Sequence, residues 1–154
     1  MILHIVHTEA SQQPVAATVA REIHRLLPGQ GARLSSVTEA AARLEADDLV
    51  LAVFSVKNGA YAPIVPFYQE LRDKKVAFLA VLCGPVDASR VRKTVWAIKK
   101  QFCGNQVLGG YLCPALDDQA WGLSTEEMNK VINFSRKLYD DHIAFQENPM
   151  AVNY

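Results

Sequence analysis

The chain has 154 residues, of which 50% are hydrophobic and 21% are charged, a composition typical of one globular domain with a substantial core. Sixteen basic residues balance sixteen acidic ones, so no overall field draws the protein to nucleic acid or to an anionic membrane. The three cysteines form neither a CxxC pair nor a cluster with histidines, which gives no support to a metal site or a disulfide framework.

The first half of the chain alternates between apolar runs and segments of helical period. Ile2 to Val6 predicts a strand buried on both faces, and a weaker strand is expected from Arg33 to Val37. Thr38 to Glu45 predicts a short alanine-rich helix. The helix between the first two strands has an apolar stripe made of Val15, Val19, Ile23, Leu26 and Leu27.

The second half continues the alternation. Further buried strands are predicted at Leu49 to Val56, Val76 to Cys83 and Val107 to Leu112. A last helix is predicted from Ser124 to Phe145, because Ser124 and Glu127 have the spacing of a capping box. A helix is also predicted in each of the two intervals between these strands. The apolar stripe of the first helix is Ile64, Phe67 and Leu71, and that of the second is Val91, Val95, Ile98 and Phe102.

Five strand-helix units in succession predict an α/β fold, a doubly wound parallel sheet of five strands with helices on both faces, in three layers. We expect one domain over residues 1–145 and a C-terminal tail over 146–154. Ligands of such sheets bind beyond the carboxyl ends of the strands, near the point where the strand order reverses. That rule selects the loops Thr8 to Gln13, Lys57 to Ala62 and Gly84 to Ala88.

The order of these elements resembles a short-chain flavodoxin over roughly Met1 to Ile143. The most specific stretches are DLVLAVFSVKNGAY from Asp48, FYQELRDKKVAFLAVLCGP from Phe67 and NQVLGGYLCPAL from Asn105. The resemblance implies a protein that binds FMN and transfers single electrons to a partner oxidoreductase. No catalytic triad, P-loop or dinucleotide-binding glycine motif appears in the sequence.

The first loop departs from the family's phosphate-binding pattern, (Ser/Thr)-x-Thr-Gly-x-Thr. Only its first residue fits that pattern, and Glu9 puts a carboxylate where the phosphate dianion would lie. Its polar residues can still offer amides and side-chain donors, with Pro14 preset for the first helical turn. Two functions therefore stay open: FMN-dependent electron transfer, and a flavodoxin-like module that has lost FMN and acts as a binding or regulatory partner. The loop consists of Thr8, Glu9, Ala10, Ser11, Gln12 and Gln13.

The other two loops would hold the flavin ring. Tyr61 is a candidate for stacking on the ring, whereas Phe54 is more simply explained as core. A cysteine in a buried strand, such as Cys83, is more often inert than reactive. The resemblance implies cofactor contacts at Ser55, Val56, Lys57, Asn58, Gly59, Tyr61, Cys83, Gly84 and Pro85.

Each of these loops also has a simpler interpretation. The Asn58-Gly59 pair fits a peptide that flips near the flavin, and equally a plain tight turn. The Gly84-Pro85 pair fits a backbone approach to the flavin, and equally a turn that starts the next helix.

Several features outside the loops bear on location and partners. Met1 to His7 is short, carries no basic n-region and is followed by no small-residue cleavage site, and no apolar run reaches the roughly 20 residues that cross a bilayer, so we expect a cytoplasmic protein. His4 is interpreted as a core histidine and His7 as a rim residue. Phe134 and Phe145 lie off the main stripe of the last helix, where they either flank a wide core or mediate a homodimer.

The helix after the fourth strand is rich in basic residues, which usually means a solvated face. This neutral, locally basic chain differs from electron-transfer flavodoxins, which tend to be acidic, and so the usual partner set is in doubt. The basic residues are Arg90, Arg92, Lys93, Lys99 and Lys100.

Overall fold

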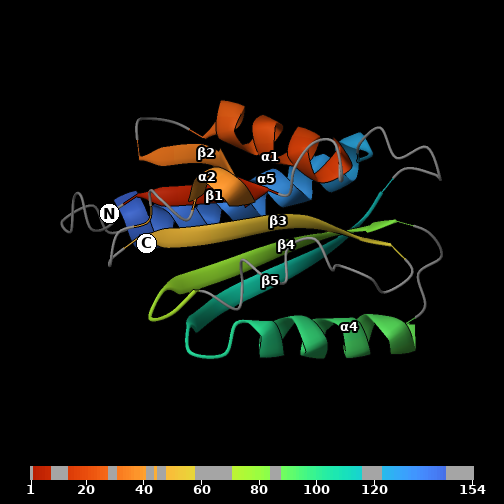
Figure 1. Cartoon of the computed structure of the whole chain (residues 1–154). Helices are drawn as coiled ribbons and strands as arrows, with labels where there is room; N and C mark the ends of the chain where they lie inside the picture. The colour runs from red at the N-terminus through yellow and green to blue at the C-terminus, as the bar shows by residue number, and fades with distance from the viewer. Residues whose placement is uncertain are drawn as a thin grey trace.

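A computed structural model describes residues 2–7, 14–27, 31–40, 44, 48–57, 71–83, 88–115 and 123–144. Within these ranges strands and helices alternate along the chain, except between β3 and β4, where residues 58–70 lie outside the described part (Figure 1). The elements are β1 (Leu3–His7), α1 (Pro14–Leu26), β2 (Ala32–Ser36), α2 (Val37–Ala40), β3 (Leu49–Lys57), β4 (Lys75–Cys83), α4 (Ala88–Gln101), β5 (Gln106–Pro114) and α5 (Thr125–Tyr139), which continues into a π-helical turn (Asp140–Ala144).

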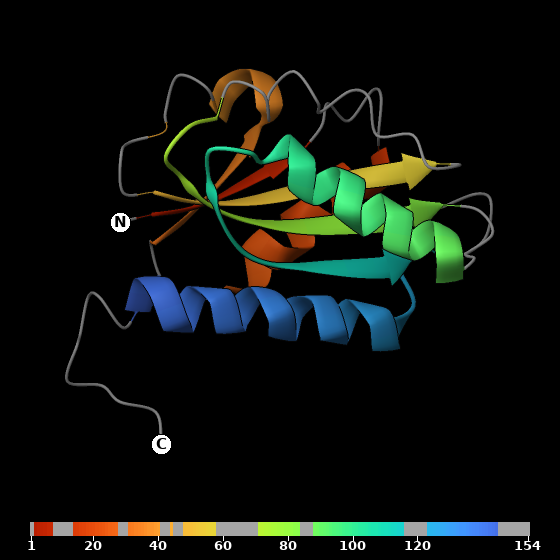
Figure 2. The same ribbon diagram turned by 90° about the horizontal axis from the view of Figure 1, so that it is seen from below.

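The strands form one five-stranded sheet in the order β2-β1-β3-β4-β5, and every neighbouring pair is parallel. Helices α1 and α5 lie on one face of this sheet and α4 lies on the other (Figure 2). The predicted fold class, with five parallel strands between helical layers, is confirmed. The strand order reverses between β1 and β3, because the chain first adds β2 on one side of β1 and then builds the sheet on the other side.

The two faces of the sheet have separate apolar cores. On one face Ile23 of α1 and Val131 of α5 pack over the sheet, and on the other Ile98 of α4 and Phe102, which follows that helix, do so. A strand between two helical layers must be apolar on both sides, which explains the continuous hydrophobic runs of β3 and β4. None of the described helices is long and apolar enough to cross a membrane.

A buried polar pair fixes the amino-terminal edge of the sheet. His4 Nε2 lies 2.8 Å from Asp48 Oδ2, and the side chains are 0% and 5% exposed. The second carboxylate oxygen of Asp48 accepts a hydrogen bond from the backbone N–H of Ile2 at 3.2 Å. The prediction that His4 is a satisfied core histidine is confirmed for its burial and for Nε2, whereas its buried Nδ1 has no hydrogen-bond partner among the described residues. Its partner Asp48 links the start of β1 to the residue before β3.

Some element boundaries differ from the predicted ones. β2 ends at Ser36, because Val37 begins α2, where the Ser36 hydroxyl accepts a hydrogen bond from the Glu39 N–H. Leu71 is buried but lies in an irregular segment before β4, and the rest of its predicted stripe lies outside the described residues. The predicted cap of α5 is confirmed, since the Ser124 hydroxyl accepts from the Glu127 N–H at 3.2 Å.

Phe134 of α5 packs on the sheet. Its ring lies 5.8 Å from the ring of Tyr111 on β5, measured between centroids, and it is partly buried against the core. This contact supports the interpretation that Phe134 flanks a wide core stripe. Homodimerisation through the last helix stays a prediction, and Phe145 lies outside the described residues.

A glycine on β5 makes room for an aromatic stack. A Cβ atom built on Gly110 would lie 2.1 Å from Cζ of Phe78, well inside van der Waals contact. Phe78 in turn stacks on Phe102, with ring centroids 6.1 Å apart and planes 18° from parallel. Gly110 therefore sets how closely the stack can approach the sheet.

We predict that Gly110→Ala lowers the free energy of unfolding by about 1–3 kcal/mol, because the new methyl group would displace the Phe78 ring. Urea unfolding followed by circular dichroism measures this. Gly109→Ala is the matched control, since its Cβ would meet only Phe134, at an ordinary 3.8 Å. Equal losses in the two variants would contradict the steric explanation.

We predict that Asp48→Ala lowers the free energy of unfolding by about 3 kcal/mol, because it leaves the buried His4 ring without its partner. The same urea experiment measures the change. Asp141→Ala removes an exposed carboxylate and is expected to change stability by less than about 0.5 kcal/mol. If Asp48→Ala lowers the free energy of unfolding as little as the control does, the His4–Asp48 pair is not a stabilising contact.

Candidate cofactor site at the carboxyl edge of the sheet

The carboxyl ends of β1, β3 and β4 meet at one edge of the sheet, because all three strands run in the same direction. The register pairs His7, the last residue of β1, with Val53 of β3. β3 continues beyond that level to Lys57, which pairs with Cys83 at the end of β4. The two longer strands therefore rise beside the end of β1, at the point where the strand order reverses.

Three side chains at this edge share the face that α1 covers. Along each strand alternate residues point to one face, and His7, Ser55 and Cys83 are in phase with the α1 core residues Ile5 and Val53. Ser55 is buried, whereas His7 and Cys83 are half-buried. The sequence placed His7 at the rim of the site, and the structure puts it on the same face as Ser55.

The other described candidates have different places. Val56 is buried on the α4 face, inside the second core. Phe54 is 0% exposed on that same face, which confirms the prediction that it is a core residue. Lys57 ends β3 beside Cys83. The structure therefore brings Ser55, Lys57 and Cys83 to one edge and assigns Val56 to packing.

The loop residues themselves lie outside the described part of the chain. The described strands and helices fix where each loop leaves and returns: from His7 to Pro14, from Lys57 to Leu71, and from Cys83 to Ala88. The candidates for which no placement is given are Thr8, Glu9, Ala10, Ser11, Gln12, Gln13, Asn58, Gly59, Tyr61, Gly84 and Pro85.

The helices that begin at this edge differ in the charge of their first turns. The first turns of α1 and α4 contain no acidic residue. The unpaired N–H groups and the dipole of a helix N-terminus favour an anion, and α1 begins directly after the loop from β1. Among the described helices, α1 therefore combines a first turn free of acidic residues with a start at the switch point of the sheet.

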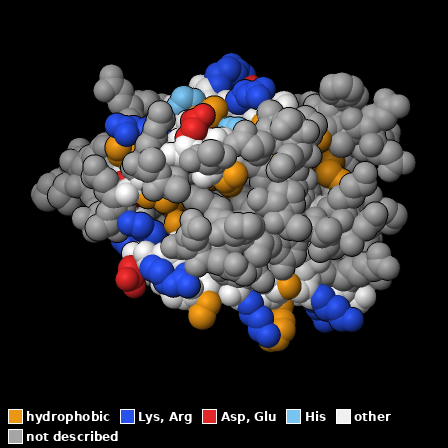
Figure 3. All heavy atoms as spheres, in the orientation of Figure 1, with side chains coloured by type: hydrophobic (Ala, Val, Ile, Leu, Met, Phe, Trp, Pro, Cys, Tyr) orange, Lys and Arg blue, Asp and Glu red, His pale blue; other side chains and the backbone are white. Residues whose placement is uncertain are grey.

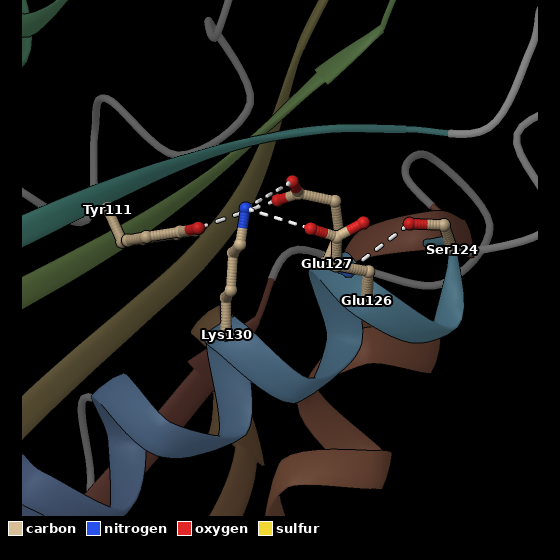
Figure 4. A network of polar contacts seen from close by, with 5 residues as sticks. All are labelled: Tyr111, Ser124, Glu126, Glu127 and Lys130. Carbon is tan, nitrogen blue, oxygen red and sulfur yellow. Dashed lines mark hydrogen bonds and ion pairs between the residues drawn. The ribbon is translucent and has the colours of Figure 1, made fainter.

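The N-terminus of α5 has its own carboxylates (Figure 4). Glu126 and Glu127 lie in its first turn, and Lys130 Nζ lies 3.6 Å and 3.5 Å from their oxygens. The Tyr111 hydroxyl donates to Glu127 at 3.5 Å, and burial, followed by the charge of Glu127, raises the pKa of Tyr111. This network links α5 to β5, and its charge disfavours a further anion there.

The cysteines differ in accessibility. Cys103 is exposed, Cys83 is half-buried, and Cys113 is buried on β5, where its thiol donates to the Ala80 carbonyl at 3.6 Å. Burial, then the nearby Glu127 and Cys83, raise the pKa of Cys113 to about 12. In the described part of the chain, no three His, Cys, Asp or Glu side chains come together as a metal site would require.

Comparisons with known proteins were made at the levels of sequence and structure. No protein-family model matches the sequence, and no curated protein matches it either. A flavodoxin of Streptococcus pneumonia TIGR4 superposes with a TM-score of 0.60 at 16% identity, covering 92% of this chain and 99% of that one.

Two other solved structures are similar. The Trp repressor binding protein of Bacillus subtilis gives a TM-score of 0.60 at 8% identity, over 88% of this chain and 96% of that chain. A flavoprotein of Lactobacillus acidophilus NCFM in complex with FMN gives a TM-score of 0.51 at 14% identity. The superposition covers 72% of this chain and 92% of that chain. Strand order, helix layers and these superpositions agree: the chain has the flavodoxin-like fold.

Proposed function

We propose that the protein binds FMN non-covalently at the carboxyl edge of the sheet and passes single electrons to a partner oxidoreductase. The observation that carries this proposal is the N-terminus of α1, free of acidic residues in its first turn, placed next to β1 where the strand order reverses. The superposition on the FMN complex of the Lactobacillus acidophilus flavoprotein supports it.

The residues at this edge divide into two roles. The segment from Thr8 to Gln13 and the first amides of α1 would hold the phosphate, which requires Glu9 to face solvent. The residues at the ends of β3 and β4, with Ser55 and Cys83 on the α1 side, would lie along the flavin ring. Bound FMN would supply the redox chemistry, while the chain binds it, orients it and excludes water.

A second candidate function is a flavodoxin-like module that has lost FMN and serves as a binding or regulatory partner. The phosphate segment favours it, because that segment has no glycine and carries the acidic residue Glu9. Repulsion between two negative charges at short range in a partly shielded site is on the order of a few kcal/mol. This is enough to remove weak FMN binding if Glu9 faces the phosphate.

The first experiment is a titration of the protein, stripped of small molecules, with FMN and with riboflavin. We expect quenching of flavin fluorescence by both, with FMN bound at least about tenfold more tightly, because only FMN has the phosphate that the α1 N-terminus would hold. A colourless preparation that quenches neither flavin would reject the FMN proposal and favour the second candidate.

A substitution locates the phosphate. Ser11→Asp adds a carboxylate just before α1 and is expected to weaken FMN binding about tenfold or more while leaving riboflavin binding nearly unchanged. Ser89→Asp makes the same change in the first turn of α4 and is the matched control. If Ser89→Asp lowers the preference for FMN and Ser11→Asp does not, the phosphate lies at α4 rather than at α1.

The thiols are not needed for the proposed electron transfer, and their reactivity is expected to follow burial. At pH 8 Cys103 should react rapidly with a thiol reagent, whereas Cys113 should not react until the protein is unfolded, since its pKa of about 12 leaves almost no thiolate. Mass spectrometry of peptides after alkylation measures this. Rapid labelling of Cys113 in the native protein would contradict the placement of its side chain.

A further inference from the structure

The outer face of α4 presents a tryptophan to solvent. Trp96 is 63% exposed and is the one large hydrophobic side chain among the described residues that is exposed. It projects away from the sheet, because Ile98, two residues later on the helix, is 0% exposed in the core. An exposed tryptophan offers much apolar area that a partner can cover.

Four cations surround this tryptophan. Arg92 and Lys93 lie one turn before Trp96, and Lys99 and Lys100 lie one turn after it, so the five side chains share one face of the helix. The four charged residues are exposed, and Lys100 Nζ lies 3.5 Å from the centroid of the Trp96 ring. Lys and Arg side chains with hydrophobic atoms among them are visible along the α4 margin of the molecule (Figure 3).

Helix α4 differs from α1 and α5 in containing basic residues and no acidic residue. On α1, Arg25 pairs with Glu22, and on α5, Lys130 pairs with Glu126 and Glu127. α4 contains no acidic residue, and the ion pairs found in the described part of the structure involve none of the four cations around Trp96. In a chain with equal numbers of acidic and basic residues, this helix is a local excess of positive charge.

A groove runs beside this face, between α4 and the edge strand β5. Its volume is about 350 Å³, and it is lined by Phe78, Val95, Lys99, Val107, Leu112 and the two glycines of β5. Lys99 lines the groove and lies one turn after Trp96, so this side chain connects the groove with the basic face. An apolar side chain of a partner fits in the groove while an acidic one meets Lys99.

The edge of β5 does not favour pairing with a further strand. Val76 pairs with Val107 but Ala77 pairs with Gly109, so Leu108 interrupts the register as in a β-bulge. The strand ends at Pro114, which has no N–H to donate. Bulges and prolines disfavour the addition of a strand at a sheet edge, and a partner is therefore expected to contact the helix rather than extend the sheet.

The chemistry of this surface favours a protein over a membrane or a nucleic acid. A helix that lies on a bilayer inserts its apolar face, but the apolar face of α4 packs on the sheet and leaves one aromatic ring outside. Nucleic-acid surfaces depend on an extended positive field, which a chain with no net charge does not provide. An aromatic anchor ringed by charges is typical of protein interfaces.

We propose that the outer face of α4, centred on Trp96 and flanked by Arg92, Lys93, Lys99 and Lys100, docks an acidic surface of a partner protein. Trp96 is the anchor, the cations provide electrostatic complementarity, and the groove beside β5 takes an apolar side chain. The proposal does not depend on FMN, since the docking surface lies on the outside of the helix.

The experiment titrates the isotope-labelled full chain with a synthetic glutamate-rich peptide that contains leucine, observed by NMR. We expect shifts concentrated in α4 and β5 and at the Trp96 indole N–H, with Trp121→Phe used to assign the indole signal. Trp96→Ala should weaken binding roughly tenfold, as removal of an anchor does. Arg92→Gln combined with Lys99→Gln should weaken it to a similar degree and reduce its salt dependence.

The matched control is Arg136→Gln combined with Lys137→Gln, which removes the same charge from exposed positions on α5 and should change affinity by less than about twofold. Circular dichroism confirms that each variant is folded. If Trp96→Ala binds the peptide as the parent does, the face is a solvated charge patch and the proposal fails. Tighter, Trp96-dependent binding to phosphatidylserine vesicles or to a thymidine oligonucleotide would reject an acidic protein as the partner.

Discussion

The burial of strands on both faces is the constraint on which the rest of this structure depends. A strand covered by helices on both sides can satisfy its backbone only with neighbouring strands, and the helical crossovers make those neighbours parallel. Parallel strands end at a common edge, and β1, β3 and β4 all end there. The location of the candidate site is therefore a consequence of core packing, before any loop residue is considered.

The same constraint explains why the fold could be predicted from sequence. The uninterrupted apolar runs of β3 and β4 identify strands with no solvent face, and the apolar stripes of α1, α5 and α4 supply the covering layers. The N-cap of α5 at Ser124 could be predicted from the sequence, because capping depends on a few neighbouring residues. The contact of His4 with Asp48 could not be predicted from the sequence, because the two residues are 44 positions apart and only the parallel pairing of β1 with β3 brings them together.

The candidate site was predictable in position but less so in composition. Topology identifies the edge, and strand alternation separates Ser55, on the α1 face, from Val56, which packs in the opposite core. The contacts of the loops depend on backbone conformations that periodicity does not specify. The basic face of α4 could have been predicted from the sequence, because the cations three and four residues before and after Trp96 must share one face of the helix with it.

The His4–Asp48 pair affects which parts of the sequence can change without loss of folding. It joins β1 to the start of β3 at the amino-terminal edge of the sheet, the end opposite the loops that follow β1, β3 and β4. Because this contact and the two cores lie within the described strands and helices, sequence change at the opposite edge need not weaken the framework. Substitutions in the segment from Thr8 to Gln13, which follows β1, can therefore accumulate on such a scaffold while folding is preserved.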